Sequence, residues 1–123
     1  MNDSVSYILC VDDDHINMVL LQHHLKDIYE IKCVVNGQEC LDAVKERKPD
    51  LILLDLMMPV MSGMDACKQL KGSVKTDEIP IVIVTVFVKE IAKYEMFTLG
   101  VNDYLIKPFT KEQLLKSINN CLP

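Results

Sequence analysis

The 123-residue sequence lacks several features that would place it outside ordinary globular proteins. No apolar run is long enough to span a bilayer and no signal-peptide pattern opens the chain, so we expect a cytoplasmic protein without membrane contact. The net charge is −5, which gives no electrostatic reason to bind nucleic acid. There is no repeat or low-complexity segment. Because half of the residues are hydrophobic, we expect one domain, residues 1–123, with its own core.

The sequence also lacks a Cys-x-x-Cys pair, although it contains five cysteines. Their spacing does not fit a zinc site. Their number is odd, and most lie among apolar neighbours, so we predict reduced thiols that act as small buried hydrophobes. These residues are Cys10, Cys33, Cys40, Cys67 and Cys121.

What the chain does contain is a fivefold alternation of short apolar runs and helix-like segments. We predict strands at 7–11, 31–35, 51–54, 79–84 and 102–106, and helices at about 15–27, 38–47, 64–71, 88–99 and from 110 to the end. This order is typical of an α/β protein with a parallel sheet covered by helices on both faces. In the last helix we expect a capping box of Thr110 and Gln113 at the start. In the first helix we expect Asp14 at the N-cap or in the first turn. Its predicted apolar stripe is Ile16, Val19, Leu20 and His23, widened by Leu21, Leu25 and Ile28.

Polar side chains follow four of the five predicted strands. Asp12 and Asp13 come after the first strand, and Asp55 comes after the third, Leu51 to Leu54. Thr85 follows the fourth strand and Lys107 the fifth. Each residue has an ordinary explanation, since Asp and Thr are frequent in turns and a lone Lys is usually solvated. The carboxyl ends of parallel strands share one edge, however, and ligands bind there.

Three carboxylates, a hydroxyl and an ammonium group at one edge suit phosphoryl transfer onto a carboxylate. Oxygen ligands with open positions favour Mg²⁺ over zinc. Asp12, Asp13 and Asp55 would hold the ion, and Asp55 would be the nucleophile that forms an acyl phosphate. Lys107 would neutralise charge on the phosphoryl group, and the Thr85 hydroxyl would donate a hydrogen bond to it.

With these residues in view, the chain resembles the receiver domain of two-component response regulators. The matching motifs are 11–17 (VDDDHIN), 54–63 (LDLMMPVMSG), 81–85 (IVIVT) and 100–108 (GVNDYLIKP). The resemblance implies a flavodoxin-like three-layer sandwich, with a five-stranded parallel sheet in the order 2-1-3-4-5 and five helices. It implies that Asp55 accepts a phosphoryl group from a sensor histidine kinase or a histidine phosphotransfer protein. It also implies Mg²⁺, or Mn²⁺, bound by Asp13, Asp55 and the backbone carbonyl of Met57, with Asp12 acting through water.

The resemblance further implies a switch between Thr85 and Tyr104, in which phosphate on Asp55 draws the Thr85 hydroxyl inward and Tyr104 rotates inward. The alternative for Tyr104 is an aromatic strand residue that packs on its neighbours, but its place three residues before Lys107 favours the switch. The output surface would be the fourth helix, fifth strand and fifth helix, which would bind a downstream effector protein or domain. The family implies a cis Lys107–Pro108 peptide bond, and a monomer or a phosphorylation-dependent dimer.

One departure from the family pattern and two other functions stay open at this stage. Val86 stands where the family usually has a small residue, so we expect slower phosphorylation by small donors such as acetyl phosphate, or slower access of the hydrolytic water. A hydrolase with an aspartyl-phosphate intermediate is one alternative, but its usual second Asp is replaced by Met57. A passive interaction module that takes no phosphate is the other. The sequence identifies neither the cognate kinase nor the target, and it fits a stand-alone regulator, a relay intermediate or an excised receiver.

Overall fold

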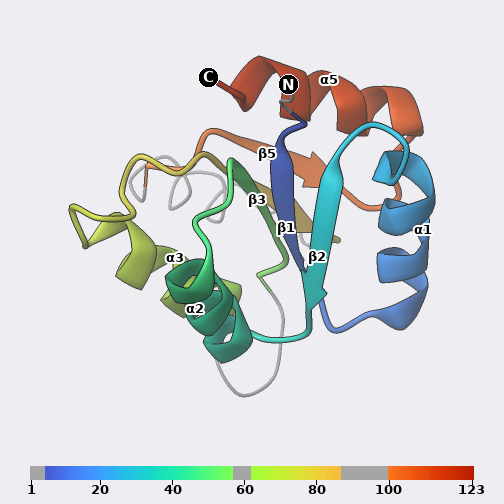
Figure 1. Ribbon diagram of the computed structural model, residues 1–123. Helices are drawn as coiled ribbons and strands as arrows, with labels where there is room; N and C mark the ends of the chain where they lie inside the picture. Colours follow the sequence, from blue (N-terminus) through green and yellow to red (C-terminus); the bar gives the residue numbers. More distant parts are fainter. Residues whose placement is uncertain (1–4, 57–61, 87–99) are drawn as a thin grey trace.

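The protein is an α/β sandwich built on one parallel sheet, described here from a computed structural model (Figure 1). The structure describes residues 5–56, 62–86 and 100–123. The sheet has five strands in the order β2-β1-β3-β4-β5, as predicted. The strands are β1 Tyr7–Val11, β2 Glu30–Val34, β3 Leu51–Leu54, β4 Ile81–Thr85 and β5 Asp103–Ile106.

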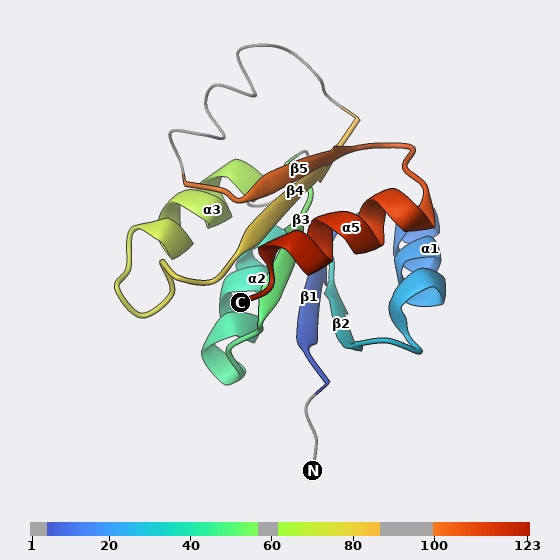
Figure 2. The same ribbon diagram turned by 90° about the horizontal axis from the view of Figure 1, so that it is seen from above.

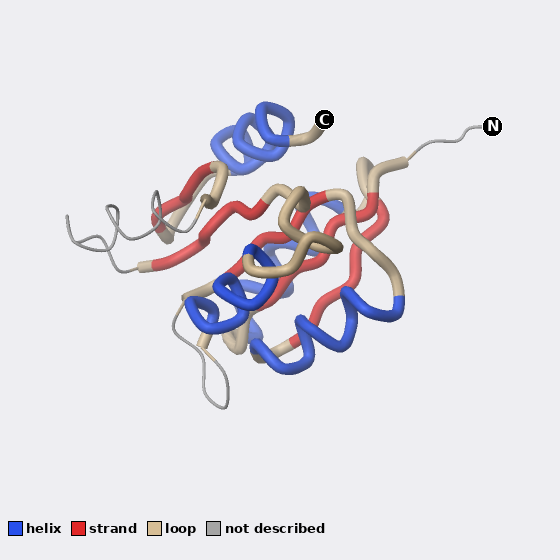
Figure 3. The backbone as a smooth tube through the Cα atoms, turned by 90° about the vertical axis from the view of Figure 1, so that its left-hand side faces the viewer, coloured by secondary structure: helices blue, strands red, loops and turns tan. Residues whose placement is uncertain are grey.

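Helices cover both faces of this sheet. Within the described residues they are α1 His15–Leu25, α2 Gly37–Glu46, α3 Gly63–Lys71 and α5 Lys111–Cys121. Helices α2 and α3 lie on one face, and α1 and α5 lie on the other (Figure 2). Viewed from the side, the strands run between these two layers (Figure 3). The expected helix at 88–99 lies outside the described residues.

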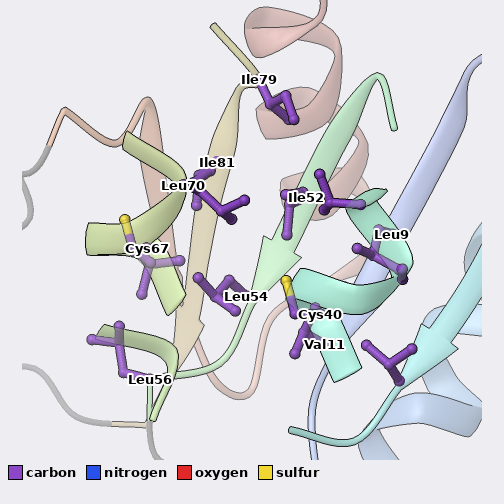
Figure 4. Close-up of a cluster of buried hydrophobic side chains, with 14 residues drawn as sticks. Leu9, Val11, Cys40, Ile52, Leu54, Leu56, Cys67, Leu70, Ile79 and Ile81 are labelled. Atoms are coloured by element: carbon purple, nitrogen blue, oxygen red, sulfur yellow. The ribbon is translucent and has the colours of Figure 1, made fainter. Parts of the chain in front are cut away.

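The continuous apolar strands reflect burial on both faces. Along β3, Ile52 and Leu54 point into the cluster under α2 and α3, whereas Leu51 and Leu53 point into the cluster under α1 and α5. Residues 8–11 of β1 and 81–84 of β4 alternate between the two clusters in the same way. Burial on both faces of the sheet explains why these runs are continuously apolar. Figure 4 shows the first cluster, in which Cys40 of α2 and Cys67 of α3 pack over the strands.

Short polar residues set the helix starts, as the sequence predicts for α1 and α5. Asp14 caps α1 by accepting hydrogen bonds from the backbone N–H groups of Ile16 and Asn17. Thr110 and Gln113 form the predicted capping box of α5. Ser62 caps α3, which therefore begins at Gly63, one residue earlier than expected.

The prediction for the inward face of α1 was right for Leu21 and Leu25, which are buried with Met18 and Asn17. It was wrong for the rest of the expected stripe, because the following residues are exposed: Ile16, Val19, Leu20, His23 and Ile28. Helix α1 carries apolar residues around much of its circumference, so periodicity alone could not identify its buried face. The helix also ends at Leu25, before the expected Asp27.

Candidate functional site

The carboxylates of Asp12, Asp13 and Asp55 converge at the carboxyl edge of the sheet. One oxygen from each lies within 4.8 Å of the others. Asp55 directly follows β3, and its backbone N–H donates to the carbonyl of Val11 at 2.9 Å. The backbone N–H of Asp12 donates to the carbonyl of Val34 at 3.1 Å. The ladder of the sheet therefore continues into the acidic residues and fixes their backbone.

The three carboxylates differ in their exposure to solvent. Asp12 is 1% exposed and Asp55 is 5% exposed, whereas Asp13 is open to solvent. Burying a carboxylate is costly unless charges or hydrogen bonds compensate for its lost hydration. The two buried acids therefore require nearby donors or cations.

The Lys107 ammonium group supplies a positive charge beside both buried acids. Its Nζ lies 2.7 Å from Asp12 Oδ2 and 3.5 Å from Asp55 Oδ2. Burial lowers the pKa of Lys107, but the hydrogen bond and charge of Asp12, together with Asp55, outweigh burial and leave the pKa above its usual value. The Lys107–Pro108 peptide bond is cis, the isomer that the resemblance implies.

The side chain of Asp12 accepts hydrogen bonds from donors that the sequence did not reveal. Its Oδ1 accepts from the backbone N–H of Asp14 at 2.9 Å. Its Oδ2 accepts from the Asn17 side-chain amide at 2.5 Å, as well as from Lys107. Asn17 is the last residue of the motif at 11–17, but no role was predicted for it. Its position five residues after Asp12, at the start of the capped helix α1, is the signal that could have identified it.

Thr85 and Tyr104 lie on one face of the sheet, on adjacent strands. Thr85 is the last residue of β4 and is 1% exposed. Tyr104 of β5 is the register partner of Ile83 and packs against the cluster under α2 and α3. Because side chains alternate along a strand, Thr85 shares the face of Ile83 and hence that of Tyr104. The Thr85 carbonyl accepts a hydrogen bond from the backbone N–H of Lys107 at 2.8 Å.

The chemistry of this donor set fits a divalent cation. Three carboxylates and one ammonium group leave a formal excess of negative charge, and all ligand atoms are oxygens, which Mg²⁺ and Mn²⁺ prefer. The structure thus brings together Asp12, Asp13, Asp55 and Lys107, and it places buried Thr85 at the end of the neighbouring strand. The Met57 carbonyl of the expected ligand set lies outside the described residues.

A pocket of about 290 Å³ opens beside these residues, between α1 and the segment that follows β5. Asn17 and Lys107, which both contact Asp12, contribute to its wall. The exposed α1 residues Ile16 and Leu20 also line it, as does Val86. The acidic cluster therefore borders a hollow with a largely apolar rim. Within the described residues, no helix is long and apolar enough to cross a membrane.

Comparison with known proteins identifies the family to which this arrangement belongs. The family model of the response regulator receiver domain matches residues 8–119. The chemotaxis protein CheY4 of Vibrio cholerae is 30% identical, with a TM-score of 0.91, and the match covers 97% of this chain and 100% of CheY4. The receiver domain of a signal transduction histidine kinase from Syntrophus aciditrophicus is 28% identical, with a TM-score of 0.88 and coverage of 96% and 90%.

A third structure shares the fold at lower identity. It is the receiver domain of sensor histidine kinase PA1611 from Pseudomonas aeruginosa, which has a magnesium ion in its active-site cleft. That domain is 24% identical, with a TM-score of 0.87 and coverage of 96% of this chain and 98% of its own. Phosphorylation on an aspartate and Mg²⁺ binding in an acidic pocket are general for receiver domains, which are phosphoacceptor switches of two-component signalling. The chain belongs to the response regulator receiver domain family.

Proposed function

We propose that the whole chain, residues 1–123, is a receiver module in which Asp55 accepts a phosphoryl group from a histidine of a sensor kinase or a histidine phosphotransfer protein. The observation that carries this proposal is the convergence of three carboxylates at one edge of the sheet, two of which, Asp12 and Asp55, lie beside the Lys107 ammonium group. In the transfer, an Asp55 carboxylate oxygen attacks phosphorus, the P–N bond of the phosphohistidine breaks, and the histidine leaves with the electron pair.

The proposed cation site comprises Asp13, Asp55 and the backbone carbonyl of Met57, with Asp12 acting through water. The contacts of Asp12 support this division, because its two oxygens already accept three hydrogen bonds. Asp13 is exposed and is better placed to bind an ion directly. When bound, Mg²⁺ or Mn²⁺ would offset the repulsion between these acids and the phosphoryl oxygens.

Lys107, which pairs with Asp12 and Asp55, would also bind the phosphoryl group. Its ammonium group lies between Asp12 and Asp55 and is nearer to Asp12. A phosphoryl group on Asp55 would place new anionic oxygens beside the same ammonium group, which would form charge-assisted hydrogen bonds with them. Thr85 would donate its hydroxyl to another phosphoryl oxygen.

Phosphorylation of Asp55 would also operate the switch between Thr85 and Tyr104. Movement of the Thr85 hydroxyl toward the phosphoryl group would vacate space on the face that Tyr104 shares. Tyr104 would then turn inward and change the surface formed by residues 88–99, β5 and α5. A downstream effector protein or domain would bind that surface. The receiver itself would be a monomer or a phosphorylation-dependent dimer.

The donor protein would bind over α1. Ile16 is 72% exposed, and Val19 and Leu20 are about half exposed on the same helix. Ile16 and Leu20 flank the pocket that leads to Lys107. A histidine on a partner helix could reach Asp55 while that helix covers these apolar side chains, which gives a reason for their exposure.

Phosphotransfer profiling tests the proposed function. The reduced full chain is offered to a panel of phosphorylated histidine kinases and phosphotransfer proteins, with Asp55→Asn as the variant and Asp27→Asn, an exposed α1-end carboxylate, as the matched control. We expect Mg²⁺-dependent transfer to wild-type and Asp27→Asn protein and none to Asp55→Asn.

Multiple turnover of a phosphate ester would favour the hydrolase alternative. Failure to bind Mg²⁺ and beryllofluoride would favour a passive module.

A further inference from the structure

Two thiols lie opposite each other near the edge of the sheet, on the face covered by α1 and α5. Cys10 of β1 and Cys33 of β2 are register partners in the parallel ladder. Both side chains pack on the same hydrophobic cluster, the one under α1 and α5. Neighbouring strands lie about 4.7–4.9 Å apart, which falls within the Cα separations that disulfides span. A bond between the two sulfur atoms would therefore join strands that are already adjacent.

The two thiols differ in their access to solvent. Cys10 is fully buried in the cluster under α1 and α5. Cys33 is half-buried on β2, which is an edge strand of the described sheet. The side-chain amide of Gln22 on α1 donates to Cys33 Sγ at 3.4 Å. A small reagent from solvent can thus reach Cys33, while Cys10 lies behind it.

The same contacts make Cys33 the more reactive of the two. The hydrogen bond from Cys10 outweighs the effect of burial and, together with that from Gln22, lowers the pKa of Cys33 to about 6. The thiolate is the nucleophilic form of cysteine, and a lowered pKa increases its population near neutral pH. Geometry and chemistry therefore agree on which sulfur reacts first.

The other three cysteines differ from Cys33 in this respect. Burial raises the pKa of Cys40 to about 12 and raises the pKa of Cys67 as well. Both residues are fully buried on the opposite face of the sheet. Cys121 is half-buried near the end of α5, and burial raises its pKa also. Cys121 is therefore a matched control, because its exposure resembles that of Cys33.

We propose that Cys33 and Cys10 form an oxidation-sensitive dithiol, which hydrogen peroxide or a related hydroperoxide converts into an intrachain disulfide. The Cys33 thiolate attacks one peroxide oxygen, the O–O bond breaks, and hydroxide leaves, so that Cys33 becomes a sulfenic acid. The Cys10 sulfur then attacks the Cys33 sulfur, the S–O bond breaks, and the Cys10 proton and the leaving hydroxide form water. The two sulfurs lose two electrons in total, and the peroxide gains them. A dithiol reductant reverses the bond by exchange.

Limited oxidation of the full chain tests this proposal. Reduced protein is treated with hydrogen peroxide, quenched with N-ethylmaleimide and examined by intact-mass and peptide mass spectrometry. With the quench carried out in denaturant, we expect a product that carries two fewer maleimide adducts than the reduced chain, with the peptides of Cys10 and Cys33 joined. Cys33→Ser should slow the loss of the first thiol by about tenfold or more, because it removes the most nucleophilic sulfur. Cys121→Ser should oxidise at the wild-type rate.

A second variant separates the two chemical steps. Cys10→Ser should stop at a sulfenic acid on Cys33, which dimedone traps. If Cys10→Ser does not fold, as judged by far-UV circular dichroism, the wild-type peptide map and Cys33→Ser still decide the outcome. The proposal is overturned if Cys33→Ser oxidises as fast as wild type. It is also overturned if the first disulfide joins another pair or two chains.

Discussion

The Asn17 side-chain amide and the Lys107 ammonium group donate to the same oxygen, Oδ2 of Asp12, at 2.5 and 2.7 Å. Asn17 lies in the first turn of α1 and Lys107 directly follows β5, so the two donors come from segments far apart in the sequence. Asp12 is thereby fixed in the orientation from which, in our proposal, it contacts the cation through water. Asn17 acts as a positioning residue, because it acts through Asp12.

We predict that Asn17→Ala weakens cation binding. Loss of the amide leaves Asp12, which is almost fully buried, with one donor fewer, so the free energy of unfolding should fall by about 1–2 kcal/mol. The dissociation constant for Mg²⁺ should rise several-fold, because Asp12 is less well oriented. Mg²⁺ titration and urea unfolding measure the two effects. Asn119→Ala, an exposed α5 variant, is the control. An unchanged Mg²⁺ affinity in Asn17→Ala would refute the positioning role.

Gly63 and Asp55 are in such close contact that the first residue of α3 must be glycine. A Cβ at position 63 would lie 1.9 Å from the backbone carbonyl oxygen of Asp55. We predict that Gly63→Ala displaces the acceptor, lowers the free energy of unfolding by about 1–3 kcal/mol and slows phosphotransfer to Asp55. The transfer rate and urea unfolding should be compared with those of Gly72→Ala at the other end of α3, where the nearest atom would lie at 3.0 Å. Equal losses of stability and of transfer rate in both variants would contradict the proposed displacement of Asp55.

The exposed apolar face of α1 gives a prediction about the donor. Ile16→Asp should slow transfer from a phosphorylated donor protein by about tenfold, because it places a carboxylate in an apolar contact. Phosphorylation by acetyl phosphate should change little, since that donor needs no docking surface. Val74→Asp is the matched control, because Val74 is 90% exposed but lies in the segment after α3. Equal transfer rates for the two variants would place the docking surface elsewhere.

The ends of β1, β3 and β5 were predicted to the residue, because their apolar runs end abruptly at polar residues, and the ends of β2 and β4 each differ from the prediction by one residue. Asp12, Asp55 and Lys107 could be assigned to one edge without coordinates, since parallel strands share a direction. The donors that hold Asp12 could not be predicted, because they depend on side-chain orientation at the start of α1. The same holds for the preference of Lys107 for Asp12 over Asp55, which is a difference of less than 1 Å between two contacts.

The continuous apolar runs predicted a sheet buried on both faces, but periodicity did not predict the buried face of α1. Ile16, Val19 and Leu20 form an apolar stripe as convincing as the one containing Leu21 and Leu25. Which stripe is buried depends on how α1 packs against the sheet, and only the structure reveals this. The expectation that the cysteines are small buried hydrophobes holds for Cys10, Cys40 and Cys67, whereas Cys33 and Cys121 are half-buried. The pairing of Cys10 with Cys33 was not predicted, because register between strands is not visible in sequence spacing.

The lowered pKa of Cys33 predicts how stability depends on pH. Since the folded-state pKa of about 6 lies below the usual thiol value, the thiolate contributes stability above about pH 8.5. This contribution should be lost as the pH falls from about 8.5 toward 6. Urea unfolding with reductant present should therefore show a smaller rise in stability across this range for Cys33→Ser than for wild type. Cys121→Ser should follow wild type, and an identical pH profile for Cys33→Ser would contradict the assignment.

Chemical mapping of the phosphorylated residue tests the central claim most directly. The full chain receives a radiolabelled phosphoryl group from a competent phosphohistidine donor, with Mg²⁺ or with a chelator, and the acyl phosphate is located by borohydride reduction and peptide mass spectrometry. The account predicts one labelled site, Asp55, and loss of labelling when the metal is chelated. Label on a different residue, or equal labelling of Asp55→Asn, would contradict it.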